Sequence, residues 1–212
     1  MSDQSTSRRQ YRSSLRAAQA SRTRAAITGA ARELFETSGF AGTTIAQIAK
    51  HAGVATQTVY AAFGSKAKVA RAIVEQMEES ADAALWRERI AAEDDPQRIL
   101  RAFAEWTGAF FSASMPQLLM AREVAAEMEE MAAEGNARRR AGLTALIQRI
   151  ATTGAIRRGL SEVEAVDRAW ILTGLDTYLN ATSGCGWPPA SYVNWLADML
   201  VQQLLEPDSA QN

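Results

Sequence analysis

Cysteine and histidine are almost absent from this sequence of 212 residues, which contains one of each, Cys185 and His51. A lone cysteine excludes an internal disulfide and a cysteine-based zinc site. A lone histidine leaves little material for histidine-dependent catalysis or metal binding. No glycine-rich phosphate loop is present either. We therefore predict that the chain is not an enzyme, with no catalytic residues, no metal and no cofactor.

Long apolar runs are absent as well. No stretch approaches the roughly 18 consecutive apolar residues of a membrane span. The N-terminus is polar and rich in arginine, without the apolar core of a secretory signal. We therefore predict a globular, cytoplasmic protein with no membrane partner.

Net charge is nearly absent, at -1, but the charges are unevenly distributed. Residues 1–74 contain 11 basic and 3 acidic side chains, whereas residues 75–212 contain 12 basic and 21 acidic ones. A basic N-terminal part joined to an acidic part suggests that the N-terminal part faces nucleic acid. An uneven but merely solvated surface is the alternative.

The first 20 residues contain few apolar side chains, so they cannot bury enough surface to offset the entropy of ordering. We predict a flexible basic arm over residues 1–20. Its arginines can lie along phosphates or enter a minor groove, and a passive solubilising tail fits equally well. These arginines are Arg8, Arg9, Arg12 and Arg16.

Helical periodicity begins at Ser21 and continues to a stop at Ser38-Gly39. A second helix is predicted from Thr44, because Thr44 and Gln47 have the spacing of a capping box. It ends at Ala52-Gly53, and a third helix is predicted over residues 55–62. These elements define a predicted domain over residues 21–66.

The rest of the chain shows only helical patterns. We predict a second domain over residues 67–205 and a tail over 206–212. The first two predicted helices cover residues 65–85 and run from Asp95-Pro96 to Ser112. A short and a long helix follow over residues 116–153, with a possible break at Gly135-Asn136. The last two helices cover residues 161–181 and 191–205, and a loop is predicted over 183–189.

Residues 43–69 have the layout of a helix-turn-helix, two short helices joined by a tight glycine-containing turn. The second helix of such a motif enters a major groove. Its predicted outward residues are small and uncharged, which suits close approach to base edges. They are Thr56, Gln57, Thr58, Tyr60 and Ala61.

This segment resembles the TetR/AcrR family of bacterial regulators. The family's pattern is matched, at the same spacings, by Thr44, Ile48, Ala49, Ala52, Gly53, Val54, Thr58, Val59, Tyr60, Phe63, Ser65 and Lys66. The resemblance implies an all-α fold of about nine helices. It comprises an N-terminal three-helix DNA-binding domain and a C-terminal helical ligand-binding and dimerisation domain.

The resemblance also implies roles for individual residues. Thr44, Thr58 and Tyr60 contact phosphates, and Lys66 anchors the DNA backbone. Thr56 and Gln57 face the bases. Gln57 can pair with adenine for about 1–3 kcal/mol of discrimination, and Ala61 can pack on a thymine methyl. The chain departs from the family at Ala46, where arginine is common, and at Ala55, which leaves Thr56 as an alternative helix cap.

A ligand site in a helical domain requires large apolar side chains with a few polar groups. Plain hydrophobic core is the competing interpretation of these residues, and the sequence does not decide between a cationic and an anionic ligand. The candidates are Phe103, Trp106, Phe110, Met120, Trp170, Asp176 and Tyr178.

The sequence thus predicts a homodimeric, sequence-specific transcriptional regulator. In this prediction a repressor binds a palindromic operator in double-stranded DNA, and an unidentified small molecule releases it. The alternative is an architectural DNA-binding protein that is indifferent to sequence and has no ligand control.

Overall fold

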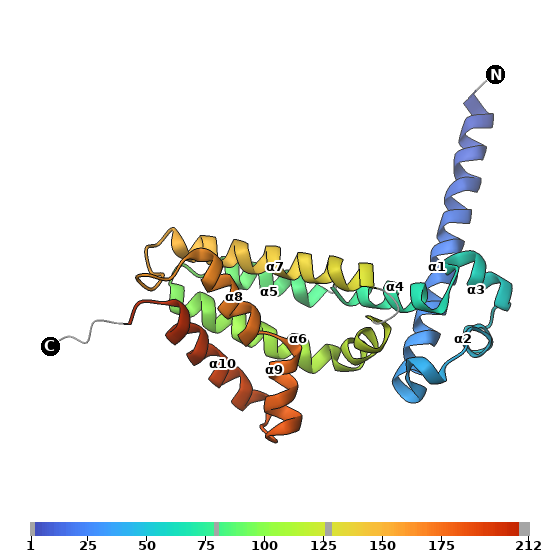
Figure 1. Cartoon of the computed structure of the whole chain (residues 1–212). Helices are drawn as coiled ribbons and strands as arrows, with labels where there is room; N and C mark the ends of the chain where they lie inside the picture. Colours follow the sequence, from blue (N-terminus) through green and yellow to red (C-terminus); the bar gives the residue numbers. More distant parts are fainter. Residues whose placement is uncertain (1–2, 79–80, 126–128, 208–212) are drawn as a thin grey trace. The chain divides into compact units, whose positions relative to one another are not determined.

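A computed structural model of the chain describes residues 3–78, 81–125 and 129–207, and these ranges are all-helical as predicted. They form ten α-helices and one short π-helix, where the family resemblance implied about nine helices (Figure 1). Their only β-type pairing is an isolated bridge between Ile156 and Leu205. Of the helices in these ranges, none combines the length and hydrophobicity needed to cross a membrane.

The chain divides into two compact units. Unit 1 comprises Met1–Met77 and Pro116–Met128, and unit 2 comprises Glu78–Met115 and Glu129–Asn212. Unit 1 therefore extends past residue 66, the predicted domain boundary, and includes a segment from the middle of the chain. Two hydrogen bonds tie that segment to α1 (Asp3–Gly42): Gln117 to Glu36, at 2.9 Å, and the Phe40 amide to Glu123, at 3.3 Å.

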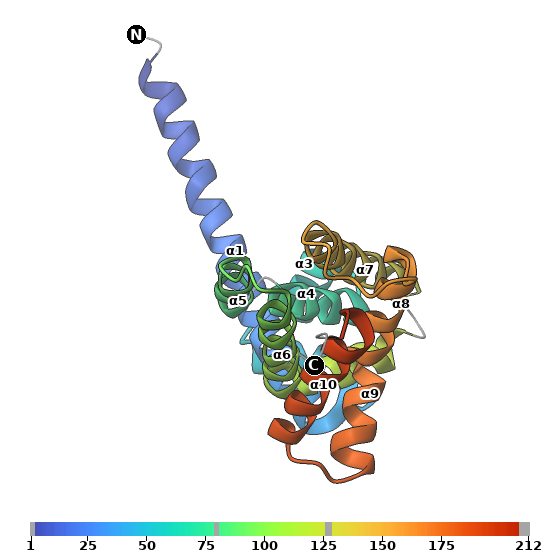
Figure 2. The same cartoon turned by 90° about the vertical axis from the view of Figure 1, so that its left-hand side faces the viewer.

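Helix α1 begins at Asp3, so residues 3–20 are helical and not the flexible arm that we predicted. No proline or glycine interrupts residues 3–28, and alanine, arginine and glutamine are good helix formers. In Figures 1 and 2 the N-terminal half of α1 extends beyond α2 and α3. The helix breaks at Gly39, whose φ of 71° confirms the predicted stop.

Three further helices complete the N-terminal part of unit 1: α2 (Ile45–His51), α3 (Thr56–Phe63) and α4 (Lys66–Glu78). The predicted turn between α2 and α3 is confirmed, and Gly53 supplies its positive φ of 68°. A single apolar core holds these helices at fixed angles. It contains Ile27, Ala31, Phe35, Phe40, Ile48, Ala49, Val59, Phe63, Val69, Ala70 and Ile73.

The predicted helix over residues 65–85 is instead described as α4 and α5 (Ala81–Ala91), on either side of residues 79–80, which lie outside the described ranges. Leu85, in α5, is 62% exposed. The apolar spacing that linked the two helices therefore does not correspond to one continuous buried stripe.

The break predicted at Pro116 is wrong, because α6 (Pro96–Ala125) runs through it. Proline removes one helical hydrogen bond, but its fixed φ is compatible with a helix. Ser114, Met120 and Val124 are buried around it, so packing stabilises the continuous helix. Likewise α7 (Glu129–Ala151) continues through Gly135, because one interior glycine costs only about 1 kcal/mol.

The single helix predicted over residues 161–181 is also wrong. The capping box of Ser161 and Glu164 starts α8 (Glu162–Leu172) as predicted. The chain then breaks at Gly174, which has extended backbone angles, before α9 (Leu175–Leu179) and a π-helix (Asn180–Gly184). The π-helix replaces the start of the predicted loop.

The last helix, α10 (Pro189–Leu204), packs against α8 (Figures 1 and 2). Leu196, Leu200, Leu204 and Tyr192 are fully buried. Of the predicted tail, Glu206 bonds to Ala155 at 3.0 Å, whereas residues 208–212 lie outside the described ranges.

Candidate DNA-binding and ligand sites

The outer surface of α3 carries the predicted reading residues. Thr56, Gln57, Tyr60 and Ala61 are exposed, and Thr58 is half-buried beside them. At about 100° per residue these four exposed positions fall within an arc of about 140°. The opposite side holds Val59 and Phe63, which are 1% and 7% exposed. The helix is therefore anchored on one side and offers a compact, uncharged surface on the other.

The start of α3 leaves Thr56 available. Ala55 occupies the N-cap position and makes no side-chain cap, while Thr56 is the first helical residue. Thr56 therefore does not take over the cap, the alternative that the sequence raised. Without a side chain bonded to them, the first amides of α3 keep their capacity to donate to a phosphate.

Thr44 is exposed, but its hydroxyl serves as the N-cap of α2. It donates to Gln47 Oε1 at 2.8 Å and accepts from the Gln47 amide at 3.2 Å. The predicted capping box is confirmed, since the Thr44 amide also donates to Gln47 Oε1 at 2.8 Å. These hydrogen bonds fix the N-terminal end of α2.

Lys66 makes internal contacts that the sequence did not indicate. Its Nζ donates to the carbonyls of Phe40 and Thr43 at 2.7 and 2.9 Å, and it lies 4.1 Å from the centre of the Phe40 ring. The ammonium therefore joins the start of α4 to the end of α1. We accordingly leave its side chain out of the proposed phosphate contacts, because two of its three donors already serve the fold.

Arg24 makes a second internal link, which sequence reasoning missed. Its guanidinium donates to the carbonyl of Ala62 and lies 4.0 Å from the centre of the Phe63 ring. It therefore caps the C-terminal end of α3 from α1, where a cation is favoured by the helix dipole. The spacing of basic residues along α1 gave no signal for this contact.

Several predicted ligand residues form a row of rings in unit 2. Phe103, Trp106 and Phe110 are half-buried along α6, with centroids 5.5 and 5.8 Å apart. The row continues through Phe111 to Tyr178, at 5.9 and 5.0 Å. Tyr178 is buried, and its hydroxyl lies 3.1 Å from that of Ser112.

The other three predicted ligand residues are not part of this row. Met120 is buried and belongs to unit 1, whereas the rings of the row belong to unit 2. Asp176 is exposed at the start of α9. Trp170 is half-buried on α8 and stacks on Arg139, whose guanidinium lies 3.9 Å from the ring centroid.

Arg139 is a half-buried polar residue on an otherwise apolar face of α7. It stands in the stripe of α7 that continues through Leu143, Ile147 and Ile150, which are at most 3% exposed. Its Nη2 donates to the Trp170 carbonyl at 2.6 Å and to Thr173 Oγ1 at 2.9 Å. Burial lowers the pKa of Arg139.

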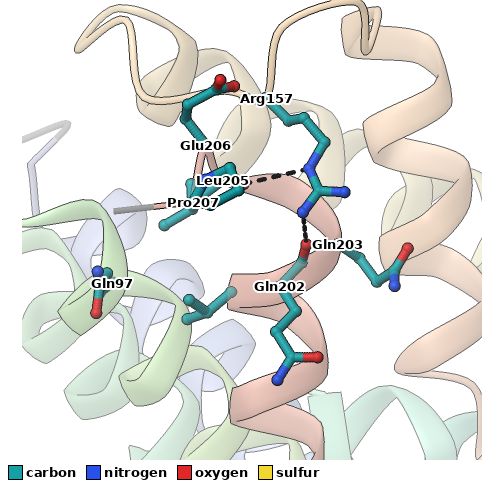
Figure 3. Close-up of a pocket in the computed structure, with 8 residues that line it drawn as sticks. Gln97, Arg157, Gln202, Gln203, Leu205, Glu206 and Pro207 are labelled. Carbon is teal, nitrogen blue, oxygen red and sulfur yellow. Dashed lines mark hydrogen bonds between the residues drawn. The ribbon is translucent and has the colours of Figure 1, made fainter. Parts of the chain in front are cut away.

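A pocket of about 410 Å³ lies at the C-terminal end of α10 (Figure 3). Its polar lining includes Gln97, Gln202 and Arg157, whose Nε donates to the Leu205 carbonyl at 3.4 Å. None of the predicted ligand residues lines it.

Residues 27–73 match the family described as bacterial regulatory proteins, tetR family. The match covers residues 27–42 of α1, both helices of the helix-turn-helix and α4 up to residue 73. No match was found among curated protein sequences.

Solved structures share the fold over most of the chain. NalD of Pseudomonas aeruginosa, the secondary repressor of the MexAB-OprM multidrug efflux pump, is 23% identical, covers 87% of this chain and 98% of its own, and has a TM-score of 0.69. FadR of Bacillus subtilis in complex with stearoyl-CoA is 18% identical, with 84% and 97% covered and a TM-score of 0.65. A transcriptional regulator from Saccharomonospora viridis in complex with choline is 16% identical, with 88% and 99% covered and a TM-score of 0.69.

The family match covers the helix-turn-helix, and the solved structures share the all-helical fold over 84–88% of this chain. Both comparisons lead to regulators and not to enzymes. Residues 27–73 therefore match the tetR family of bacterial regulatory proteins, and the chain shares its fold with solved transcriptional regulators.

Proposed function

We propose that this protein is a repressor whose homodimer binds a palindromic operator and is released by a small molecule. DNA binding is assigned to residues 21–66, and ligand binding and dimerisation to residues 67–205. The observation that carries the proposal is the exposed arc of α3, which presents small uncharged side chains within a basic N-terminal segment. Such a surface can approach base edges while the surrounding charge attracts phosphates.

Within this arc, Gln57 is the residue that reads bases most directly, by a bidentate hydrogen bond to adenine. Thr56 and Ala61 flank it, and Ala61 offers a methyl group to a thymine methyl. Tyr60, which is 49% exposed, contacts phosphates together with Thr58. Thr44 is left out of these contacts, because its hydroxyl and its amide both donate to Gln47 Oε1. In this assignment the phosphate contacts set the register and Gln57 supplies most of the sequence preference.

Dimerisation through α8 is supported by two large apolar side chains that unit 2 leaves uncovered. Val163 and Ile171 are 66% and 68% exposed and lie about two helical turns apart. Side chains of this size at an exposed helix face are typical of a subunit interface. A two-fold dimer would place two copies of α3 on successive major grooves, about 34–36 Å apart.

Ligand control is supported by the half-buried aromatic row on α6. The same helix continues to Gln117 and Glu123, which bond to residues of α1. A ligand that shifted α6 would thereby act on the helix that supports the helix-turn-helix. The free energy by which the ligand weakens DNA binding is then limited by the difference between its affinities for the DNA-binding state and the released state of the protein. FadR and the Saccharomonospora viridis regulator were both solved with a small molecule bound.

The decisive experiment is a binding selection over random double-stranded DNA with the full-length protein, followed by salt titration on the enriched sequence. We expect a palindromic motif with half-sites about one helical turn apart. We also expect affinity for this motif at least about 10³-fold above that for random DNA.

Equal affinity for enriched and random DNA, with a steep salt dependence, would instead indicate the architectural alternative. A motif without two-fold symmetry would contradict the dimer while leaving sequence-specific binding intact. The two parts of the proposal are therefore tested separately in one data set.

A further inference from the structure

The N-terminal half of α1 carries charges of one sign only beyond its first residue. Between Asp3 and Glu33 the sequence contains seven arginines and no acidic residue. Four of these arginine positions fall within an arc of about 100° around the helix, because each residue advances by about 100°. They are Arg8, Arg9, Arg12 and Arg16. This side of the helix therefore carries positive charge that no carboxylate of the same segment can neutralise.

The same part of α1 lacks a packed face where its exposure is described. Residues 16–22 are all exposed, which corresponds to about two helical turns, and full burial begins only at Ile27. In Figures 1 and 2 this part of the helix extends beyond α2 and α3. Arginines four residues apart on a helix also repel one another. A helix with neither an apolar face nor opposite charges is expected to have an anionic partner outside the chain.

This charged segment begins beside the proposed DNA-binding surface. Arg24 in α1 donates to the carbonyl of Ala62 at the end of α3 and stacks on the Phe63 ring. Ala62 directly follows Ala61, the last position of the exposed arc of α3. The segment therefore continues from the edge of that arc within the same unit. From Asp3 to Arg24 the helix is about 32 Å long, which equals about nine base pairs of DNA.

We propose that the N-terminal half of α1 is a second DNA-binding element, which lies along the sugar-phosphate backbone next to the bases contacted by α3. This inference rests on the proposed DNA binding of residues 21–66 and adds a contact surface outside them. An α-helix is about 10–12 Å wide and the minor groove only about 6 Å, so the helical segment follows the backbone and does not enter that groove. Its phosphate contacts add affinity but no sequence preference.

The test replaces the arginines at positions 8, 9, 12 and 16 of the full-length protein with glutamine, which is also a good helix former. Fluorescence anisotropy measures binding against salt concentration, on a duplex of random sequence and on an equally long duplex carrying the motif enriched by selection. Each lost phosphate contact should lower the slope of log affinity against log salt by about 0.9, so we expect a decrease of at least about 2 per subunit. Both duplexes should lose affinity by the same factor, at least about 10-fold at about 0.1 M salt.

Two further variants separate this contact from a general effect of charge. Lysine at the same four positions keeps the cations and should keep the salt dependence, because lysine binds phosphate as a point charge. Replacing four exposed arginines of unit 2 with glutamine removes the same charge and should leave both slopes unchanged. These are Arg87, Arg101, Arg138 and Arg158. Circular dichroism and thermal unfolding show whether each variant keeps its helices and its stability.

Three results would overturn the inference. The first is a salt dependence that the glutamine variant leaves unchanged, which would indicate a passive solubilising tail. The second is a loss of affinity confined to the motif duplex, and the third is an equal loss in the variant of unit 2. The random duplex keeps the test independent of the proposed repressor. A selection that enriches no motif, together with a lower salt slope of the glutamine variant, would contradict sequence-specific regulation and leave the α1 contact standing.

Discussion

Around the helix-turn-helix, some side chains are bonded to the backbone of their own unit, and others are exposed. Arg24 and Lys66 are both basic and both close to α3, yet each is bonded to backbone carbonyls of its own unit. Gln57 and Tyr60 carry no charge and are exposed. Basic residues near α3 can therefore serve the fold, and in the proposed assignment the uncharged residues read the DNA.

Replacing Lys66 with methionine is predicted to destabilise the protein by about 1.5–3 kcal/mol, because the carbonyls of Phe40 and Thr43 lose a charged donor. Lys68→Met, at an exposed position, should change the free energy of unfolding by less than about 0.5 kcal/mol. Urea denaturation of both variants measures the difference. Unchanged stability of Lys66→Met together with a smaller salt dependence of DNA binding would restore the phosphate role.

Replacing Gln57 with alanine is predicted to cost about 1–3 kcal/mol of binding to the operator and much less on random DNA. Tyr60→Phe removes only a hydroxyl assigned to a phosphate, so it should weaken both complexes about equally. Fluorescence anisotropy with the two DNAs gives the four affinities. An equal loss on both DNAs for Gln57→Ala would show that Gln57 does not read bases.

At the level of the elements, arginines from neighbouring helices cap the C-terminal ends of several helices. Arg24 contacts the end of α3. Arg149 donates to Ile90 in α5 at 2.8 Å, and Arg168 donates to Gln203 in α10 at 3.0 Å. Arg139 does the same for α8. The cations satisfy carbonyls without a helical partner and oppose the negative end of each helix dipole, which fixes where neighbouring helices meet.

The packing of α6 on α10 depends on Gly108. A Cβ added there would lie 2.3 Å from Val193 Cγ2, far inside van der Waals contact. Gly108→Ala is therefore predicted to destabilise the protein by about 1–3 kcal/mol, although alanine is the better helix former. Gly142→Ala in α7 meets no atom within 4 Å and should stabilise by up to about 1 kcal/mol.

Thermal and urea unfolding of the two variants provide the comparison. Opposite signs would confirm that close approach of α6 and α10, and not helix propensity, requires the glycine at position 108. A stabilised Gly108→Ala variant would contradict the close packing.

For the whole molecule, the proposed dimer depends on α8. Ile171→Glu places a charge in a buried interface, so the dimer dissociation constant should rise by at least about 30-fold, equivalent to about 2 kcal/mol for one central contact. Gln148→Glu adds the same charge at an exposed site on α7 and should leave the dimer intact. Sedimentation equilibrium over a range of concentrations measures both. An unchanged dimer with Ile171→Glu would place the interface elsewhere.

Structural features that depend on residues only a few positions apart were predicted correctly. The capping box of Thr44 and Gln47 and the glycine breaks at Gly39 and Gly53 follow from spacing and backbone stereochemistry alone. The exposed arc of α3 was predicted for the same reason, since one face of a short helix is fixed once its buried residues are known.

The features that the sequence did not reveal depend on contacts between distant residues. Packing keeps α6 helical through Pro116, and the partners of Lys66 and Arg139 lie more than 20 residues away along the chain. Local pattern determined the all-helical class and the helix-turn-helix of this protein. Only the tertiary structure decided which cations serve the fold, because hydrogen-bond partners are chosen by proximity in space and not by spacing in sequence.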